Sequence, residues 1–265
     1  MPLLQTLGAS FLNFLDYLGQ LVALAREILI SLLQGRIRSR KVWEQLAEIG
    51  FRSQVVVGIT GAFTGAVLAA QTLFQFQTFG LESMAGGLVG VAMLRELGPT
   101  ITGLMLAGRV GSAMSAEIGT MKVTEQVDAL RSMAVHPVDF LVTPRLLAMF
   151  LAIPLLIAQS SLLGIGASYV VGVSVFEVSP AYWSANTARY LATPDLVIAV
   201  IKGLSFGILI VLISCHQGLR ASNGATGVGR GTTNAMVFSS LAILIVNFFL
   251  TLLMQIFFPA ALSGS

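Results

Sequence analysis

Charged side chains stand inside two long apolar stretches of this sequence, where they are costly unless they meet a partner. Arg95 and Glu96 interrupt the stretch 87–116, and Lys202 interrupts the stretch 196–215. Ionisable residues in a segment long enough to cross a membrane usually face protein or a water-filled cavity, and they often mark a transport pathway. A guanidinium or ammonium group in such a place can bind a phosphate or another anion. Arg95, Glu96 and Lys202 are therefore the candidate substrate-binding residues.

The same residues also allow a purely structural interpretation. Adjacent residues on a helix point about 100° apart, so Arg95 and Glu96 need not pair with each other. One of them could form an interhelical ion pair with Lys202 that only holds the bundle together. Lys202 could instead extend outward to the membrane surface, as long basic side chains near a helix end do. Arg109, near the end of its stretch, is expected to extend outward or to bind loop carbonyls.

A short amphipathic helix is predicted over residues 123–134. Its apolar positions recur at helical spacing, and its remaining positions are polar. The apolar stripe comprises Val123, Val127, Leu130 and Ala134, and the polar surface comprises Glu125, Gln126, Asp128, Arg131 and Ser132. Thr124 can cap the start of the helix, and Pro137 follows its end. Such a helix between two membrane spans can dock on a motor subunit or lie at the membrane interface, and the residues alone favour the interface.

Several other kinds of site are excluded by the residues that are present. The single cysteine, Cys215, rules out an internal disulfide and a cysteine-based metal site, and two distant histidines make a histidine-based metal site improbable. A phosphate-binding loop of the type Gly-x-x-x-x-Gly-Lys-Ser/Thr does not occur, and no nucleophile–base set is evident. The net charge of +3 is spread among loops, which argues against nucleic-acid binding. We therefore predict no catalytic residues and no metal.

The elements that must position these residues are membrane helices. Only 10% of the 265 residues are charged, against about 25% in soluble domains, and 55% are hydrophobic. We predict an all-α integral membrane protein: an amphipathic helix lying in the interface over 3–33, a cytoplasmic connector that completes the segment 1–52, and a membrane domain over 53–265. Its five expected spans are 54–76, 87–116, 146–176, 196–215 and 235–262.

Small residues are expected to shape the packing of these spans. Gly61 and Gly65 form a small-xxx-small pair that permits close helix contact. Gly98 and Pro99 should kink the second span, because Pro99 lacks a backbone donor. Gly108, beside Arg109, is a further expected packing position.

The distribution of basic residues predicts the orientation. The segments 34–52, 117–145 and 216–234 contain nearly all the lysines and arginines that lie between spans, whereas the opposite loops contain Arg189 alone. The positive-inside rule places the basic segments in the cytoplasm. The N-terminus is then cytoplasmic and, with five spans, the C-terminus is periplasmic.

Four short motifs across residues 91–145 closely resemble the MlaE/YrbE permease family, the membrane subunits of MCE-type lipid ABC transporters. These motifs are Glu96-Leu-Gly-Pro-Thr, Ala107-Gly108-Arg109-Val-Gly-Ser-Ala, Ala116-Glu117-Ile-Gly-Thr-Met and Glu125-Gln126-Val-Asp128-Ala-Leu130. The similarity extends over roughly residues 40–260. The plastid lipid permease of the TGD system belongs to the same family, and this chain is similar to cyanobacterial or other Gram-negative members.

The resemblance implies partners and roles that the residues alone do not. It implies a homodimeric permease core in the bacterial inner membrane, a cytoplasmic ATPase dimer that binds ATP and Mg²⁺, and a periplasmic MCE-domain protein that forms a hexameric ring. The permease itself would hold no cofactor and would not be an enzyme. The segment 123–134 would match the family's coupling helix, with Val123, Glu125, Gln126, Asp128, Leu130 and Arg131 toward the ATPase. Arg95, Glu96 and Lys202 would lie near the lipid pocket.

The resulting hypothesis is an ABC permease subunit that moves phospholipid or a related glycerolipid between the inner membrane and the MCE protein. Two other classes stay open. One is a proton-coupled secondary transporter of a small amphiphile that uses Glu96 and Arg95 as a relay. The other is a membrane scaffold that transports nothing.

Overall fold

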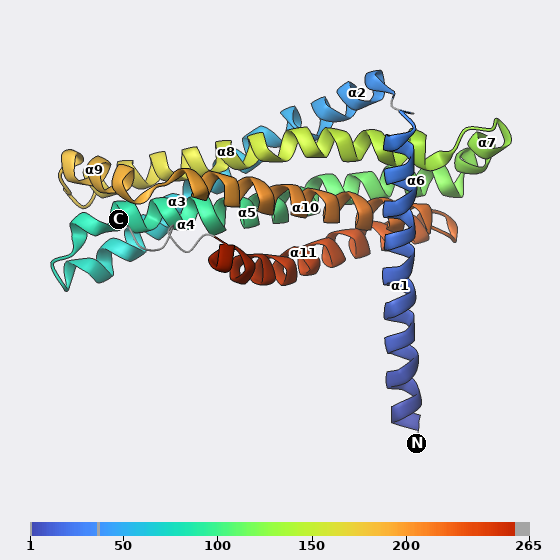
Figure 1. The fold of residues 1–265 in the computed structure, drawn as a ribbon, viewed down its shortest axis with the longest axis horizontal. Coiled ribbons are helices and arrows are strands. Elements are labelled where there is room, and N and C mark those ends of the chain that lie inside the picture. Colours follow the sequence, from blue (N-terminus) through green and yellow to red (C-terminus); the bar gives the residue numbers. More distant parts are fainter. Residues whose placement is uncertain (1, 36–37, 258–265) are drawn as a thin grey trace.

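The computed structural model describes residues 2–35 and 38–257, and every regular element within them is a helix. The all-α prediction is therefore confirmed. Long helices lie lengthwise in one bundle, whereas α1 (Pro2–Leu33) crosses the bundle at one end (Figure 1). The short helix α7 (Gln126–Ser132) lies at this end, and α9 (Pro180–Tyr190) lies at the other.

Four helical stretches among the described residues are long and apolar enough to cross a membrane. They overlap four of the five expected spans, although residues 258–262 of the last one lie outside the described residues. The first stretch, Ser39–Gln77, consists of α2 (Ser39–Ile49), a 3-10 turn (Phe51–Ser53) and α3 (Gln54–Gln77). The second, Val138–Ser174, consists of a π-helical turn (Val138–Val142) and α8 (Thr143–Ser174). The other two are single helices, α10 (Thr193–Leu219) and α11 (Gly224–Phe257).

The expected span 87–116 is not one of these four. Two π-helical turns divide it into short α-helical pieces that follow one another along the bundle (Figure 1). The pieces are α4 (Ala85–Ala92), a π turn (Met93–Leu97), α5 (Gly98–Leu106), a second π turn (Ala107–Gly111) and α6 (Ser112–Val123). The count of five spans therefore stays a prediction.

Two segments between expected spans, 177–195 and 216–234, are largely helical rather than loops. Residues 177–195 contain α9, whose Trp183 is buried against α4 and α8 at Gly86 and Gly172. In the segment 216–234, α10 continues to Leu219 and α11 begins at Gly224, which leaves only a short turn. Low helix propensity misled in 216–234, because propensity is a weak guide that tertiary packing overrides, and α11 packs against both α10 and α6.

The helices α3 and α8 pack with almost no side chain between them. A Cβ atom added at Gly65 would lie 2.1 Å from the carbonyl oxygen of Gly164, and one at Gly61 would lie 2.5 Å from that of Ser160. Both distances are far below van der Waals contact, so only glycine fits at either position. The expected small-residue pair thus stands where two spans meet most closely.

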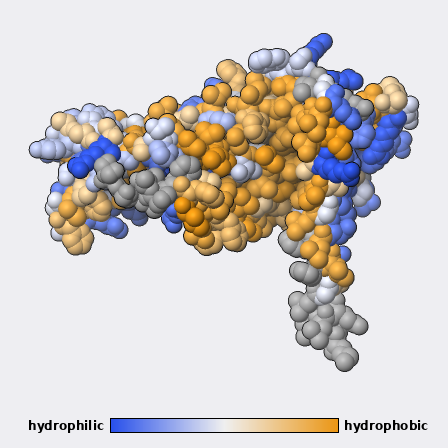
Figure 2. All heavy atoms as spheres, in the orientation of Figure 1, coloured by the Kyte–Doolittle hydropathy of each residue, from blue (hydrophilic) through white to orange (hydrophobic). Residues whose placement is uncertain are grey.

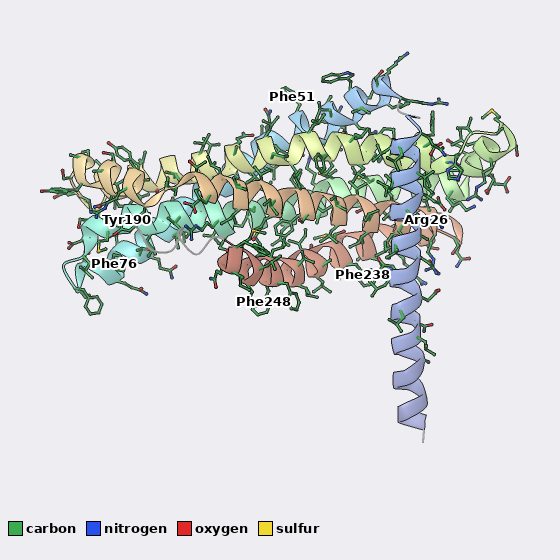
Figure 3. All side chains as sticks on the ribbon, viewed as in Figure 1. Arg26, Phe51, Phe76, Tyr190, Phe238 and Phe248 are labelled. Atoms are coloured by element: carbon green, nitrogen blue, oxygen red, sulfur yellow. The ribbon has the colours of Figure 1, made fainter. Side chains whose placement is uncertain are left out.

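The surface of the bundle is mostly apolar along its length and hydrophilic at its ends (Figure 2). Helix α11 contributes much of this apolar surface, because few of its residues are buried within the chain. Its exposed large side chains include Phe238, Leu241, Leu244, Ile245, Phe248 and Leu252, of which Phe238 and Phe248 are labelled in Figure 3. An apolar belt between two polar ends is the surface of a multi-pass membrane protein.

Candidate functional site

The charged residues singled out in the sequence meet in one polar cluster. Lys202 of α10 is completely buried, and its ammonium donates to Glu96 Oε1 at 2.7 Å, to Thr251 Oγ1 at 2.8 Å and to the Arg95 carbonyl at 3.1 Å. An ammonium group has three donors, so all of them are used. Asn247 Nδ2 also approaches Glu96, at 3.3 Å from Oε2. The buried cation is thus satisfied by two other helical segments, the π turn Met93–Leu97 and α11.

The backbone near Pro99 explains why Lys202 can bind there. Proline has no N–H group, so Pro99 cannot donate to the carbonyl four residues earlier, which is that of Arg95. Lys202 donates to this carbonyl instead. Arg95 and Glu96 themselves lie in the π turn Met93–Leu97, and π turns re-aim side chains within an otherwise regular helix. The Gly98–Pro99 pair therefore shapes a binding point as well as a helix.

A second ion pair fixes the Arg95 side chain. The Arg95 guanidinium donates from Nε to Asp195, which is fully buried at the start of α10. The other carboxylate oxygen of Asp195 accepts the Ala192 backbone N–H at 2.9 Å. Asp195 thus caps the helix that supplies Lys202 and holds Arg95 beside it.

A cavity of about 90 Å³ lies at this cluster, and it is lined by Arg95, Glu96, Lys202, Thr251, Ile198, Met254 and Gln255. Glu96 keeps 38% of its side chain exposed, so the cluster opens toward the surface at α11. The sequence prediction named Arg95, Glu96 and Lys202, and the structure brings all three together. It missed Asp195, Asn247 and Thr251. Two polar residues four apart in an otherwise apolar span were a usable signal for the last two, because polar side chains in a membrane span seek partners.

The predicted amphipathic helix is shorter than expected. Val123 ends α6, and α7 spans Gln126–Ser132. Thr124 does not cap it; the residue before the helix is Glu125, in the left-handed conformation with φ of 62°. Val127 is fully buried, whereas Glu125, Gln126, Ala129 and Ser132 are exposed. The helix is thus anchored by Val127, with Leu130 also packed against the core, and it presents a mostly polar face to its surroundings.

An ion pair between Lys122 and Asp128 also holds α7 to the end of α6. Asp128 accepts from Lys122 at 2.9 Å and from Arg131 at 3.0 Å. The hydrogen bond from Lys122, assisted by the charges of Lys122 and Arg131, lowers the pKa of Asp128 below its ordinary value. The carboxylate is therefore charged and paired at neutral pH.

A spin label at Ala129→Cys should report the pH dependence of this anchoring. A carboxylate with a lowered pKa contributes stability above its ordinary pKa, and the contribution is lost as pH falls through the folded-state value. Label mobility should therefore stay constant from about pH 7 to about pH 5 and rise only below about pH 4. The Asp128→Asn variant should show no such step. A step near neutral pH would contradict the assignment.

Two remaining predicted positions lie where α5 and α6 meet. Arg109 donates from Nη1 to the Ser53 hydroxyl, which ties the second π turn to the start of α3. This hydrogen bond goes to a side-chain hydroxyl rather than to the loop carbonyls expected from the sequence. Gly108 packs loosely, with Met236 nearest.

In residues 2–35 and 38–257, no group of three or more His, Cys, Asp or Glu side chains gathers that could hold a metal ion.

Comparison with known proteins identifies the family. The profile of the family described as Permease MlaE matches residues 42–253. A probable ABC transporter permease protein of Synechocystis sp. is 39% identical over 231 residues, covering 87% of this chain and 88% of that protein. One from Rickettsia conorii is 37% identical over 246 residues, covering 93% and 95%. The chloroplastic protein trigalactosyldiacylglycerol 1 of Arabidopsis thaliana is 38% identical over 228 residues, covering 86% and 65%. The chain belongs to the MlaE permease family.

Proposed function

We propose that this chain is the membrane subunit of an ATP-driven transporter that moves phospholipid or a related glycerolipid between the inner membrane and a periplasmic MCE-domain protein. The observation that carries the proposal is the buried cluster of Lys202, Glu96 and Arg95, which opens beside the apolar surface of α11. A charged group next to an apolar wall suits a molecule with a polar headgroup and acyl chains. One relative carries the name of a galactosylated diacylglycerol, which is a glycerolipid.

The proposed lipid site needs a second copy of the chain. The cavity at the cluster holds about 90 Å³, whereas ligand pockets usually hold about 300–1,000 Å³. Glu96 and Thr251 are only partly buried, and the neighbouring Phe248 and Leu252 of α11 are exposed. Two copies facing each other along α11 would enclose both the polar cluster and these apolar side chains. A homodimer would thus form the lipid chamber.

The chain would take its energy from an ATPase partner at the α7 end. The exposed face of α7 is short, polar and fixed to α6 by the Lys122–Asp128 pair, so a push on it would be transmitted to the bundle. ATP and Mg²⁺ would be bound by the ATPase, and the permease would hold no cofactor. The α7 end would be cytoplasmic, with the N-terminus, and the MCE hexamer would dock at the opposite end, where the C-terminus would be periplasmic.

Substitution of Ala129 by Arg should weaken the association with the ATPase. Ala129 is exposed on α7, so a long cationic side chain there blocks the proposed contact without entering the core of this chain. Co-purification of the ATPase should fall at least tenfold, while insertion of the permease is unchanged. The matched control is Ala185→Arg on the exposed surface of α9, which should leave co-purification intact. Equal losses in both variants would refute a coupling role for α7.

The direct test is to identify the lipid that the intact complex carries and the energy source that moves it. Mass spectrometry of the purified complex should detect a bound glycerolipid, and substitution of Arg95 by Gln should reduce it. In proteoliposomes, transfer should require ATP and the ATPase. Transfer driven by a proton gradient without the ATPase would favour a secondary transporter. Full transfer after joint replacement of Arg95, Glu96 and Lys202 would favour a scaffold.

A further inference from the structure

A second pocket lies at the α7 end of the bundle, between α1, α6, α7 and the end of α10. Its volume is about 700 Å³, far larger than the cavity at Lys202. Lys202 and His216, one at each site, are fourteen positions apart on α10 (216 − 202), which corresponds to about 21 Å along a helix. The two sites are therefore separate.

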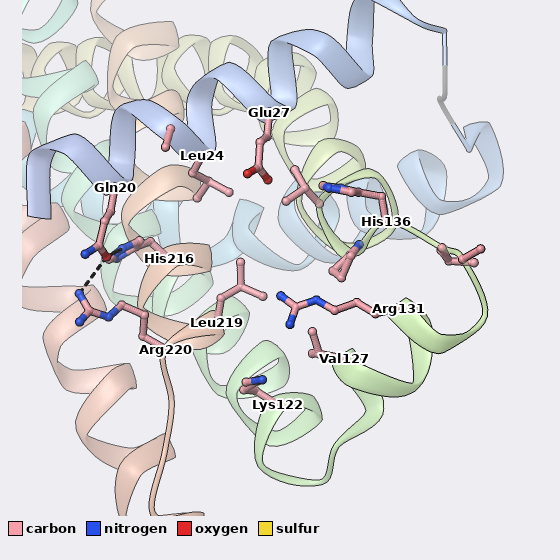
Figure 4. Close-up of a pocket in the computed structure, with 15 residues that line it drawn as sticks. Gln20, Leu24, Glu27, Lys122, Val127, Arg131, His136, His216, Leu219 and Arg220 are labelled. Atoms are coloured by element: carbon pink, nitrogen blue, oxygen red, sulfur yellow. Dashed lines mark hydrogen bonds between the residues drawn. The ribbon is translucent and has the colours of Figure 1, made fainter.

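The walls of this pocket combine basic and apolar side chains. Figure 4 shows Arg131 reaching from α7 toward Leu219, with Glu27 of α1 on the opposite wall. Leu24, Val127 and Leu219 supply apolar surface. The charged or titratable lining residues are Lys122, Arg131, Arg220, His136, His216 and Glu27. Even with Asp128, which pairs with Lys122 and Arg131, the always-charged groups sum to +1 (three cations against two carboxylates).

The lining cations keep donors for a ligand. Lys122 and Arg131 each donate one hydrogen bond to Asp128, and the Arg220 guanidinium donates to Gln20 at 3.0 Å. An ammonium has three donors and a guanidinium has five. His216 gives an independent sign of a missing ligand: it lines the pocket, is only 6% exposed, and its Nδ1 has no hydrogen-bond partner, although Nε2 contacts Gln20. A buried ring nitrogen without a partner is costly unless a ligand satisfies it.

We propose that this pocket binds a phosphate group, which Arg131, Arg220 and Lys122 would hold. Guanidinium groups match phosphate oxygens in charge and geometry, and Arg131 and Arg220 lie on the walls of the same pocket (Figure 4). The headgroup of an anionic phospholipid can supply this phosphate. Helix α1, which forms one wall, crosses the bundle (Figure 1) and exposes Leu15, Leu18 and Val22, as expected of a helix that lies at the headgroup level.

The test uses a fluorophore attached to Ala23→Cys, an exposed position that lines the pocket. The native Cys215 is buried, so labelling is selective. The full chain is placed in nanodiscs of a phosphate-free galactolipid, and either phosphatidylglycerol or inorganic phosphate is added. Saturable response to phosphatidylglycerol alone supports a lipid phosphate, and saturable response to inorganic phosphate supports a soluble phosphate compound. Response to neither would overturn the proposal.

Three variants separate phosphate binding from a structural role. Arg131→Gln combined with Arg220→Gln should weaken the apparent affinity about tenfold, because charge-assisted hydrogen bonds are lost. Glu27→Gln should strengthen it about threefold by removing a repelling charge, an opposite effect that misfolding would not produce. Arg189→Gln on α9, which removes one positive charge at the opposite end of the bundle, should leave it unchanged. Unaltered affinity in the double variant would refute the proposed site. A fluorescence response to added ATPase, without a response to phosphate, would also refute it.

Discussion

Substitution of Lys202 by Met is expected to abolish lipid transfer and also to destabilise the folded permease. The ammonium bonds Glu96, Thr251 and the Arg95 carbonyl, and all three lose their donor in this variant. Breaking a fully buried ion pair costs about 3–5 kcal/mol, and the cost here should be smaller because Glu96 keeps 38% of its side chain exposed. Thermal denaturation followed by size-exclusion chromatography measures the loss of stability. A lipid-transfer assay between liposomes measures the loss of transfer.

The double variant Glu96→Gln with Lys202→Met separates the functional role from the structural one. Removing both charges takes away the unpaired carboxylate, so most of the lost stability should return. Transfer should not return, because the headgroup would meet no cation from α10. Recovery of both properties would identify the pair as a structural contact alone, which is the interpretation that the sequence left open.

A matched ion pair elsewhere in the chain serves as the control. Arg145 is buried and pairs with Glu117 at 2.7 Å, and it also donates to the Leu141 carbonyl. Neither charged residue lines the cavity at Lys202. Transfer by the double variant Arg145→Met with Glu117→Gln should therefore follow the amount of folded protein. A specific loss of transfer in this control would mean that any broken ion pair disables the transporter.

The sequence was most informative about charged side chains in apolar stretches, because burying such a side chain in a membrane costs free energy. Arg95, Glu96 and Lys202 stood out because charges inside apolar stretches need partners, and the structure joins them in one cluster. Asp195 escaped notice because it lies at the edge of a span, where an acid is also an ordinary helix cap. Its pairing with Arg95 spans one hundred positions and depends on how α10 packs, which no local pattern reveals.

Local pattern failed where tertiary packing decides the outcome. The glycine-rich segment after Gly224 resembles a loop by propensity, yet it forms the first turns of α11. The predicted helix 123–134 was too long, because Glu125 takes a left-handed conformation that separates α6 from α7. The π turns that divide 87–116 follow no simple sequence period. In each case the backbone departs from what the hydrophobic pattern alone predicts.

Substitution of Gly65 by Ala is the second change expected to have a large effect, and it acts on assembly of the bundle. The added methyl group would lie 2.1 Å from the Gly164 carbonyl oxygen, so α3 and α8 must separate. Overpacking of this kind costs about 1–3 kcal/mol. The contact joins backbone to methyl, so no flexible side chain can relieve it. The midpoint of thermal denaturation should fall by several degrees, and the yield of folded permease should fall with it.

The same substitution at Gly166 provides the control, because it adds the same atoms to a glycine within α8 that has no neighbour. A Cβ atom at Gly166 meets nothing within 4 Å. Alanine is also favoured over glycine inside a helix by about 1 kcal/mol, so Gly166→Ala should leave stability unchanged or raise it. Opposite signs for two identical substitutions would locate the effect at the α3–α8 contact. Equal destabilisation by both would mean that glycine is needed for backbone flexibility, and the close approach of the two helices would not be the cause.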